Sequence, residues 1–222
     1  MKPLVKKIID HFKLFIDDGE FELKNAEIIA GIAALNHHDR KELRARLLKD
    51  SLVIEDNHQS ITWLQGCFRN IDKHSFRIHQ VLFSPGTEIR DALKDLLKNA
   101  KKSVKLCVFS ITDDRLANEI IDCHQRGVKV KIITDDQKIF DKGSDIQTLR
   151  SKGVDVKIDH SEYHMHNKFG VIDNRIVFTG SFNWTYTASK HNQENLLITT
   201  NHSIVEQFTE EFERLWQEMY KL

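Results

Sequence analysis

The chain has 222 residues, with 33 Lys and Arg, 33 Asp and Glu, and a formal net charge of zero. Its composition, 40% hydrophobic and 30% charged, is that of a globular protein and excludes a disordered or fibrous chain. Because the net charge is zero, binding to a polyanion would depend on a local basic surface rather than on bulk attraction.

The sequence also excludes several locations and classes. No apolar run is long enough to span a bilayer. The N-terminal stretch MKPLVKKIIDHFKLFIDDGE is interrupted by charges and lacks the apolar core of a secretory signal. Cys67, Cys107 and Cys123 are widely spaced without a CxxC pair, which argues against a disulfide framework or a structural zinc site. We therefore expect a cytoplasmic protein with reduced thiols and no membrane span.

Residues 1–70 predict a small, mainly helical N-terminal domain. Apolar residues recur at helical spacing over 3–16, and further helices are predicted for 26–35, which Asn25 would cap, and for 40–50. LVIED and SITWL then flank NHQ and predict a β-hairpin over 52–64. Three helices followed by a hairpin is the element order of a winged helix-turn-helix.

The third predicted helix has a basic surface that would suit contact with phosphates. The alternative is an ordinary solvated face, because acidic residues dilute the charge. The basic residues are Arg40, Lys41, Arg44, Arg46 and Lys49, and the acidic ones are Glu42 and Asp50.

After a polar linker predicted at 68–76, strands and helices alternate through residues 76–222. This order predicts a second domain of the α/β class, with much of its sheet covered on both faces. The expected strands are 77–85, 104–112, 128–136, 154–159 and 196–200, and the expected helices are 87–103, 113–127, 144–153 and 204–222.

The stretch HMHNKFGVIDNRIVFTGSFNW, residues 164–184, concentrates the reactive side chains. In a strand, residues two apart share a face, so His166 and Lys168 point the same way. The like charge of Lys168 disfavours a cationic imidazole, which leaves His166 neutral and able to attack an electrophile. Lys168 would hold an anionic oxygen, with Asn183 and Ser181 adding an amide and a hydroxyl. Gly180 would let the backbone approach the ligand. These groups suit a phosphate.

A nucleophilic histidine needs its second ring nitrogen held, and a carboxylate is the usual partner. Asp173 and Glu194 are the candidates. Asp173 is seven residues from His166 along the strand and turn, so we assign it a structural hydrogen bond at the turn DNR. Glu194 opens the next strand and is the preferred orienting group.

Other residues of this stretch have weaker assignments. His164 shares the face of His166 and is expected at the rim of the pocket. Trp184 is a candidate for stacking on a base, although core packing is the favoured interpretation. His160, His164 and His166 also suggest a zinc site, but Lys168 is a poor neighbour for a cation. We expect no metal and no cofactor.

HNKFGVID followed by GSFN, with Glu194 beyond, resembles the HxK(x)4D(x)6GSxN motif of the phospholipase D superfamily. The resemblance covers residues 76–222. It is greatest to single-motif members: bacterial endonucleases, Zucchini-like nucleases and cardiolipin hydrolases. It implies a mixed sheet flanked by helices, and a metal-independent phosphodiesterase that forms a phosphohistidine.

The complete motif occurs once in the chain. Members with two motifs build one site from both, so a single-motif chain would share its site across a two-fold axis. We therefore expect a homodimer in which one His166 attacks phosphorus and the other transfers the protons.

The expected function is an endonuclease acting on DNA or RNA. The alternatives are a phospholipase D-type hydrolase of phospholipids such as cardiolipin, which would use the same chemistry, and a catalytically silent nucleic-acid-binding protein. The sequence does not distinguish DNA from RNA, because phosphodiester chemistry carries little base information.

Overall fold

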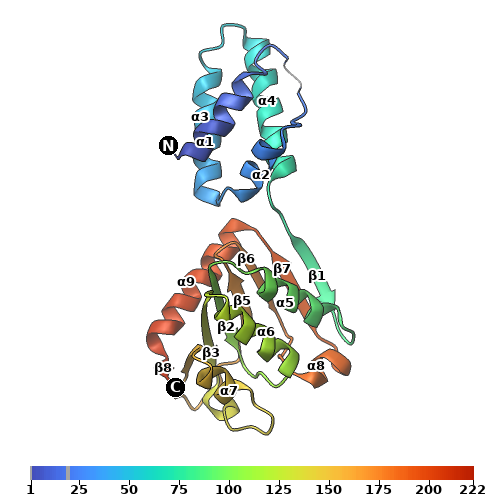
Figure 1. Ribbon diagram of the computed structural model, residues 1–222, viewed down its shortest axis with the longest axis vertical. Helices are drawn as coiled ribbons and strands as arrows, with labels where there is room; N and C mark the ends of the chain where they lie inside the picture. Colours follow the sequence, from blue (N-terminus) through green and yellow to red (C-terminus); the bar gives the residue numbers. More distant parts are fainter. Residues whose placement is uncertain (1, 19–20) are drawn as a thin grey trace. The chain divides into compact units, whose positions relative to one another are not determined.

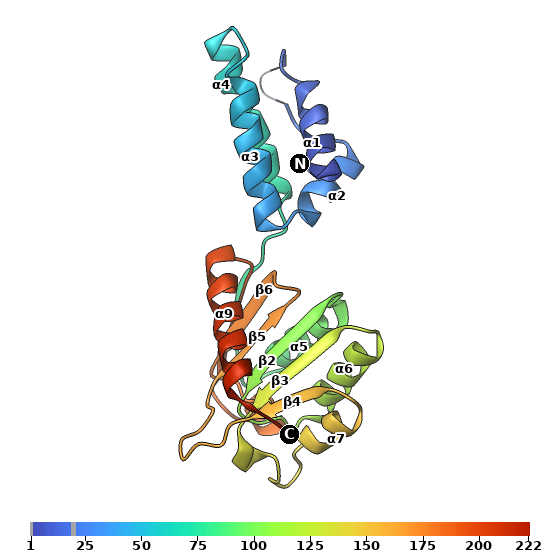
Figure 2. The ribbon, with the colours of Figure 1, turned by 90° about the vertical axis from the view of Figure 1, so that its left-hand side faces the viewer.

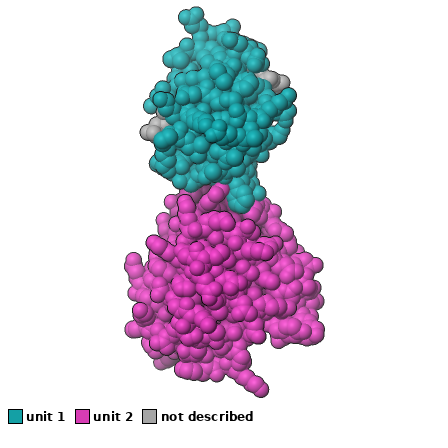
Figure 3. All heavy atoms as spheres, viewed as in Figure 1, with its two compact units in different colours: residues 1–77 teal, residues 78–222 magenta. Residues whose placement is uncertain are grey.

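The computed structural model describes residues 2–18 and 21–222, which divide into two compact units, Met1–Arg77 and Ile78–Leu222 (Figure 3). Each unit has its own apolar core. Among the described residues, no helix is long and apolar enough to cross a membrane.

The described part of unit 1 is helical and contains no strand (Figure 1). Its helices are α1 (Pro3–Lys13), α2 (Ala26–Ala34), α3 (His37–Ser51) and α4 (Asn57–His74). Asn25 caps α2 as expected, because its side chain accepts hydrogen bonds from the backbone N–H groups of Glu27 and Ile28.

The predicted hairpin over 52–64 is wrong, and so is the predicted linker over 68–76, because α4 occupies most of both. Asp56 accepts a hydrogen bond from Gln59 N and caps the helix, so NHQ begins a helix rather than a turn. Trp63, Cys67 and Ile71 then repeat every four residues and are buried on one face. Unit 1 therefore lacks the wing of a winged helix-turn-helix in its described residues.

Part of the predicted basic face of α3 is paired within the unit. Arg44 lies 2.7 Å from an Asp72 carboxylate oxygen, and Arg46 lies 3.0 Å from one of Asp50. Lys13 also contacts Asp50. These pairs reduce the charge available to phosphates, which favours the solvated-face interpretation.

Unit 2 confirms the predicted α/β class and the mixed sheet flanked by helices. The described residues form one eight-stranded sheet in the order β1-β7-β6-β5-β2-β3-β4-β8. Neighbours β2, β3 and β4 are parallel, and the other pairs are antiparallel. The strands are β1 (His79–Phe83), β2 (Ser103–Val108), β3 (Lys129–Thr134), β4 (Asp155–Ile158), β5 (Lys168–Ile172), β6 (Ile176–Gly180), β7 (Asn195–Thr199) and β8 (Tyr220–Lys221).

Helices cover both faces of the sheet (Figure 2). On one face lie α5 (Glu88–Asn99), α6 (Asp114–Gln125) and α7 (Ile146–Ser151), and on the other lies α9 (His202–Glu218). Both faces of the sheet are apolar, because successive side chains of β2 point to opposite sides. Leu106 packs in the core beneath α5 and α6, whereas Cys107 packs in the core beneath α9. The remaining helical segments of unit 2 are η1 (Asp136–Lys138) and α8 (Tyr186–Lys190).

The three cysteines are buried and unpaired. Burial raises the pKa of each thiol, that of Cys107 to about 12, with a further contribution there from Glu211. These thiols are therefore packing groups in the folded chain.

Asn70 provides a test of unit 1. Its buried amide accepts from Leu23 N and donates to the carbonyl oxygens of Phe21 and Gly66, each at 2.9 Å. Asn70→Leu should destabilise the unit by roughly 2–4 kcal/mol, because each buried polar group left unpaired costs about 1–3 kcal/mol. Native-state hydrogen exchange of α1, α2 and α4 measures this loss. Gln65→Leu, at an exposed position of α4, should change it little.

Candidate active site

Six neighbouring strands begin or finish at the same end of the sheet, where the candidate site lies. Val108, the last residue of β2, pairs with Lys168, the first of β5. Gly180, at the end of β6, pairs with Leu196 near the start of β7, and Phe83 at the end of β1 pairs with Asn195. The carboxyl end of β3 also lies at this end of the sheet, because β3 runs parallel to β2. Carboxyl ends of parallel strands are a frequent place for ligand sites.

His166 and Lys168 lie on one face, as the strand spacing predicts, and both contact the ring of Phe109. The His166 ring meets it edge-on with centroids 4.6 Å apart, and Lys168 Nζ lies 5.1 Å from its centroid. Lys168 Nζ also donates to the His166 carbonyl at 2.8 Å. Phe109 is the floor of the site, and sequence reasoning missed it. Its position directly after the buried strand β2 was the available signal.

The surroundings of His166 favour a neutral imidazole. Partial burial first, and then Lys168 and His164, hold the pKa of His166 below the ordinary value for histidine, while Asp135 acts in the opposite direction. Burial likewise lowers the pKa of Lys168, and Glu194 partly offsets this effect. The sequence argument from like charge therefore agrees in direction with the structure.

His164 lies at the rim, about half exposed, with its ring 5.4 Å from that of Phe109. Its Nδ1 is 3.0 Å from a carboxylate oxygen of Asp135, a buried residue that follows β3. Sequence reasoning missed Asp135 as well, although a carboxylate at the carboxyl end of a parallel strand is a recognisable signal. His160 faces Asp136 at 3.7 Å. The described residues contain no group of three or more potential metal ligands.

Glu194 lies elsewhere than predicted. Its carboxylate accepts hydrogen bonds from the Ser181 hydroxyl and from Asn192 Nδ2, rather than from His166, in the described chain. The buried Ser84 hydroxyl accepts from Glu194 N and fixes this turn. Glu194 and Ser181 therefore form a polar pair beside Lys168, and the prediction that Glu194 orients His166 within one chain is wrong.

Asn183 follows Ser181 in the loop after β6. Its Oδ1 is shielded from solvent and has no hydrogen-bond partner among the described residues. Buried polar groups are usually hydrogen-bonded, so this acceptor is available to a water or a ligand.

Asp173 is separated from the site, at the far end of β5. Its carboxylate accepts from the backbone N–H groups of Lys101, Lys102 and Ser103, at distances of 2.7–3.2 Å. This is the structural role at the turn that the sequence suggested, and it removes Asp173 from the catalytic candidates.

Gly180 and Trp184 serve the fold rather than the ligand. A Cβ on Gly180 would lie 2.0 Å from the Asn195 carbonyl oxygen, so the glycine permits close approach of β7 and not of a substrate. Trp184 is 1% exposed, and its ring packs near Phe178. The favoured interpretation of core packing is therefore correct for Trp184, and its assignment to substrate binding is not.

The shorter spacing HxK(x)4D also occurs in unit 1, at His11, Lys13 and Asp18. His11 and Lys13 lie in the last turn of α1, where residues two apart point in nearly opposite directions. Lys13 pairs with Asp50, and no GSxN follows. This copy does not reproduce the geometry of unit 2.

The fold and this site define a phospholipase D-like protein. A family model described as "Cardiolipin synthase, PLD-like domain" matches residues 93–216, more than half of the chain. The phospholipase D of Rickettsia typhi is 31% identical over 139 residues, which are 63% of this chain and 68% of the relative. The chain therefore belongs to the phospholipase D-like family.

One curated relative and one solved structure show the same similarity in more detail. The mitochondrial cardiolipin hydrolase of Xenopus tropicalis is 48% identical over 123 residues, 55% of this chain. The chain spans 59% of the length of that relative. The crystal structure of Nuc from Salmonella typhimurium, a phospholipase D family member, aligns with a TM-score of 0.61 and 27% identity, covering 66% of this chain and 99% of Nuc.

Lys168→Met tests the electrostatic coupling of the site. Removing a cation that lowers the pKa of His166 should raise that pKa, so the imidazole would remain protonated to higher pH. Titration of His166 followed by NMR measures the shift. Lys190→Met, in α8, should leave the titration unchanged, and a fall in the pKa of the Lys168→Met variant would contradict the coupling.

Proposed function

We propose that this protein is a metal-independent phosphodiesterase that cleaves DNA or RNA through a phosphohistidine, in an active site shared by two subunits. The observation that carries the proposal is an exposed imidazole, biased towards its neutral form, beside Lys168 on an aromatic floor. A neutral imidazole is a nucleophile, and an adjacent ammonium attracts the phosphate that it attacks.

In the proposed reaction, a ring nitrogen of one His166 attacks phosphorus. The ester P–O bond breaks, and His166 of the partner subunit, which enters the reaction in its protonated form, gives its proton to the leaving oxygen. The same partner imidazole, now neutral, takes a proton from water, which attacks phosphorus and breaks the P–N bond. His166 is then free for another cycle.

Lys168 and Asn183 from both subunits would hold the non-bridging oxygens and stabilise the charge that develops on them, a role that other nucleases give to a metal ion. The Ser181–Glu194 pair borders Lys168 and would keep its ammonium in place. We assign no catalytic role to Asp173, Gly180 or Trp184.

Two features support a shared site. The complete motif occurs once per chain, so one chain supplies one imidazole for a reaction that needs both a nucleophile and an acid. Asn183 Oδ1 also has an unfilled acceptor in the described chain. A two-fold axis through the phosphate would supply the second imidazole and further donors.

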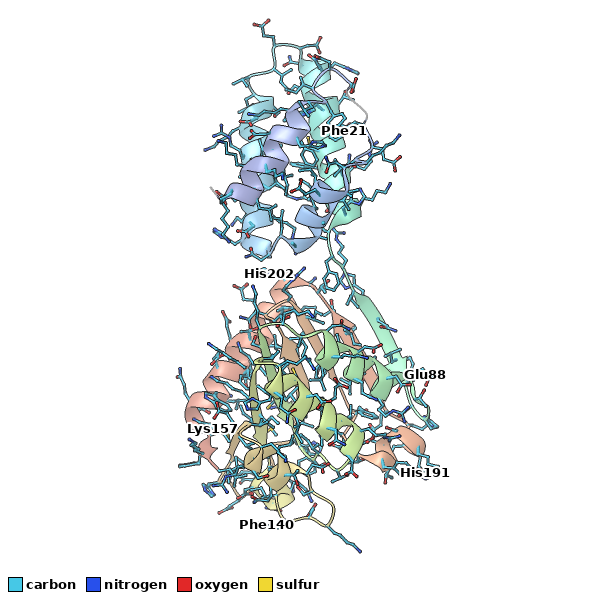
Figure 4. The ribbon with its side chains drawn as sticks, viewed as in Figure 1. Phe21, Glu88, Phe140, Lys157, His191 and His202 are labelled. Atoms are coloured by element: carbon cyan, nitrogen blue, oxygen red, sulfur yellow. The ribbon has the colours of Figure 1, made fainter. Side chains whose placement is uncertain are left out.

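A phospholipid is the second candidate substrate, since the Xenopus tropicalis relative is a cardiolipin hydrolase. Phe140 and Tyr163 are 83% and 80% exposed on the loops that follow Asp135 and precede His164 (Figure 4 labels Phe140). Exposed aromatic rings suit either stacking on bases or contact with a lipid interface. Nucleic acid remains the favoured substrate, and the test below includes both.

The first test is cleavage, in EDTA, of matched single- and double-stranded DNA and RNA, with cardiolipin vesicles in parallel. We expect cleavage of nucleic acid, its loss in His166→Ala, and retention in His202→Ala, a partly exposed histidine of α9. Release of phosphatidic acid without nucleic-acid cleavage would assign the lipid substrate instead. Activity that appears only with added divalent metal would reject the mechanism.

The second test addresses the shared site. Light scattering should give twice the chain mass of 25.9 kDa. A purified heterodimer of wild-type and His166→Ala chains should lose at least about 100-fold in activity, because the proton-transfer group or the nucleophile is missing from its single site. Two independent sites would instead retain half of the activity, and a heterodimer with His202→Ala should be fully active.

A further inference from the structure

His166 lies on a segment that the sheet does not hold. Residues 159–167 connect β4 to β5 without belonging to a strand, and Lys168 is the first residue paired with β2. A nucleophile must be held close to its attacking geometry, since a displacement of about 1 Å can cost on the order of 100-fold in rate. Contacts other than strand pairing must therefore fix residues 164–166.

Asp135 supplies these contacts from the end of β3. Its side chain is almost fully buried, and its Oδ2 accepts from Met165 N at 3.1 Å and from His164 Nδ1 at 3.0 Å. Its Oδ1 accepts from Gln137 N at 3.0 Å. A buried carboxylate is stable only when it is hydrogen-bonded in this way. Asp135 thus links the end of β3 to both residues that precede His166.

The residue between the two histidines is anchored on the opposite side. Met165 is 6% exposed, and its sulfur lies 3.3 Å from Cys107 Sγ in the core beneath α9. Because Met165 points into that core, His164 and His166 both point to the other side, where each meets the ring of Phe109. Holding His164 and the Met165 backbone in place therefore fixes the position of the backbone that carries the His166 side chain.

We propose that Asp135 is a positioning residue for His166, acting through the His164 imidazole and the Met165 N–H. This inference rests on the proposed role of His166 as the nucleophile. It assigns to Asp135 the anchoring task that the sequence had suggested for Glu194, with the difference that the carboxylate acts through the two preceding residues rather than by direct contact with the ring.

Asp135 also sets the charge around the nucleophile. The groups that face His166 are the cation Lys168 from β5, His164 from the same segment and the Asp135 carboxylate from the end of β3. Lys138 of η1 lies 5.3 Å from the centroid of the shared Phe109 ring. Asp135 is the member of this set that raises the pKa of His166, so its removal lowers that pKa further.

Asp135→Asn is the main test, because it keeps the shape of the side chain and removes its charge. In the full-length protein we expect kcat to fall by on the order of 100-fold with KM changed less than about twofold, since positioning affects the attack more than binding. The acid limb of the pH–rate profile should move to lower pH, because His166 would lose its proton more easily.

Asp136→Asn is the matched control. Asp136 is the adjacent carboxylate, but it faces His160 rather than residues 164–166, so kcat and the pH profile should both match wild type. Wild-type kcat with an unmoved acid limb in a folded Asp135→Asn variant would overturn the proposal. An equal loss in Asp136→Asn would do the same.

His164→Phe covers the case in which Asp135→Asn does not fold. Phenylalanine keeps an aromatic ring against Phe109 but cannot make the hydrogen bond to Asp135. The variant should therefore have a lower kcat with little change in KM. An unchanged kcat in this variant would count against the proposal.

Two activity-independent measurements separate this inference from the proposed function. In Asp135→Asn, the Met165 amide should exchange its hydrogen faster, and the NMR titration of His166 should move to lower pH. These changes in a protein that cleaves no phosphodiester would support the positioning contact while rejecting the proposed function. Cleavage that depends on His166, without either change, would support the function and reject the positioning role.

Discussion

Side chains of an extended chain alternate between two sides, and residues 164–169 obey this alternation although only the last two belong to a strand. Met165 and Phe169 are buried in the core beneath α9. That burial requires His164, His166 and Lys168 to emerge together on the opposite side. The hydrophobic effect that holds α9 on the sheet therefore also sets the direction of the reactive groups, and the chemistry of the site is inseparable from the packing behind it.

Electrostatics then determine the state of those groups. Partial burial and then the nearby Lys168 lower the pKa of His166, which favours the neutral imidazole. An imidazole biased towards its neutral form therefore lies beside the cation Lys168. The Asp135 carboxylate accepts a hydrogen bond from His164, and the Glu194 carboxylate is close enough to Lys168 to raise its pKa. Each cation or imidazole therefore has its own acidic neighbour.

Much of unit 2 could be predicted from the sequence, because its strands and helices are short, strongly periodic and separated by Gly or Asp signals. The grouping of His166 with Lys168 followed from strand spacing alone. Asp135 and Phe109 could not be assigned in the same way, since they reach the site through the parallel pairing of β2 with β3 and the antiparallel pairing of β2 with β5. The first pairing joins residues 26 positions apart and the second joins residues 60 to 68 positions apart, and no local pattern specifies either.

The errors in unit 1 and in the glycine assignment have physical causes as well. The window around NHQ was short enough to suit a turn, but the apolar repeat of Trp63, Cys67 and Ile71 extends beyond it, and burial of that longer face decides in favour of α4. Gly180 was expected to make room for a ligand, whereas the atom that needs the room is a backbone oxygen of β7. In both cases, packing against the rest of the unit decides the structure, and a short stretch of sequence does not show that packing.

The burial of the three cysteines has a practical meaning for work with this protein. Because all three cysteine thiols are buried and their pKa values are raised, the folded chain offers electrophiles and oxidants no reactive thiolate. A cysteine introduced at the surface would then be the sole site of maleimide or spin labelling. Distances between two introduced labels would thus become measurable without first removing the native cysteines.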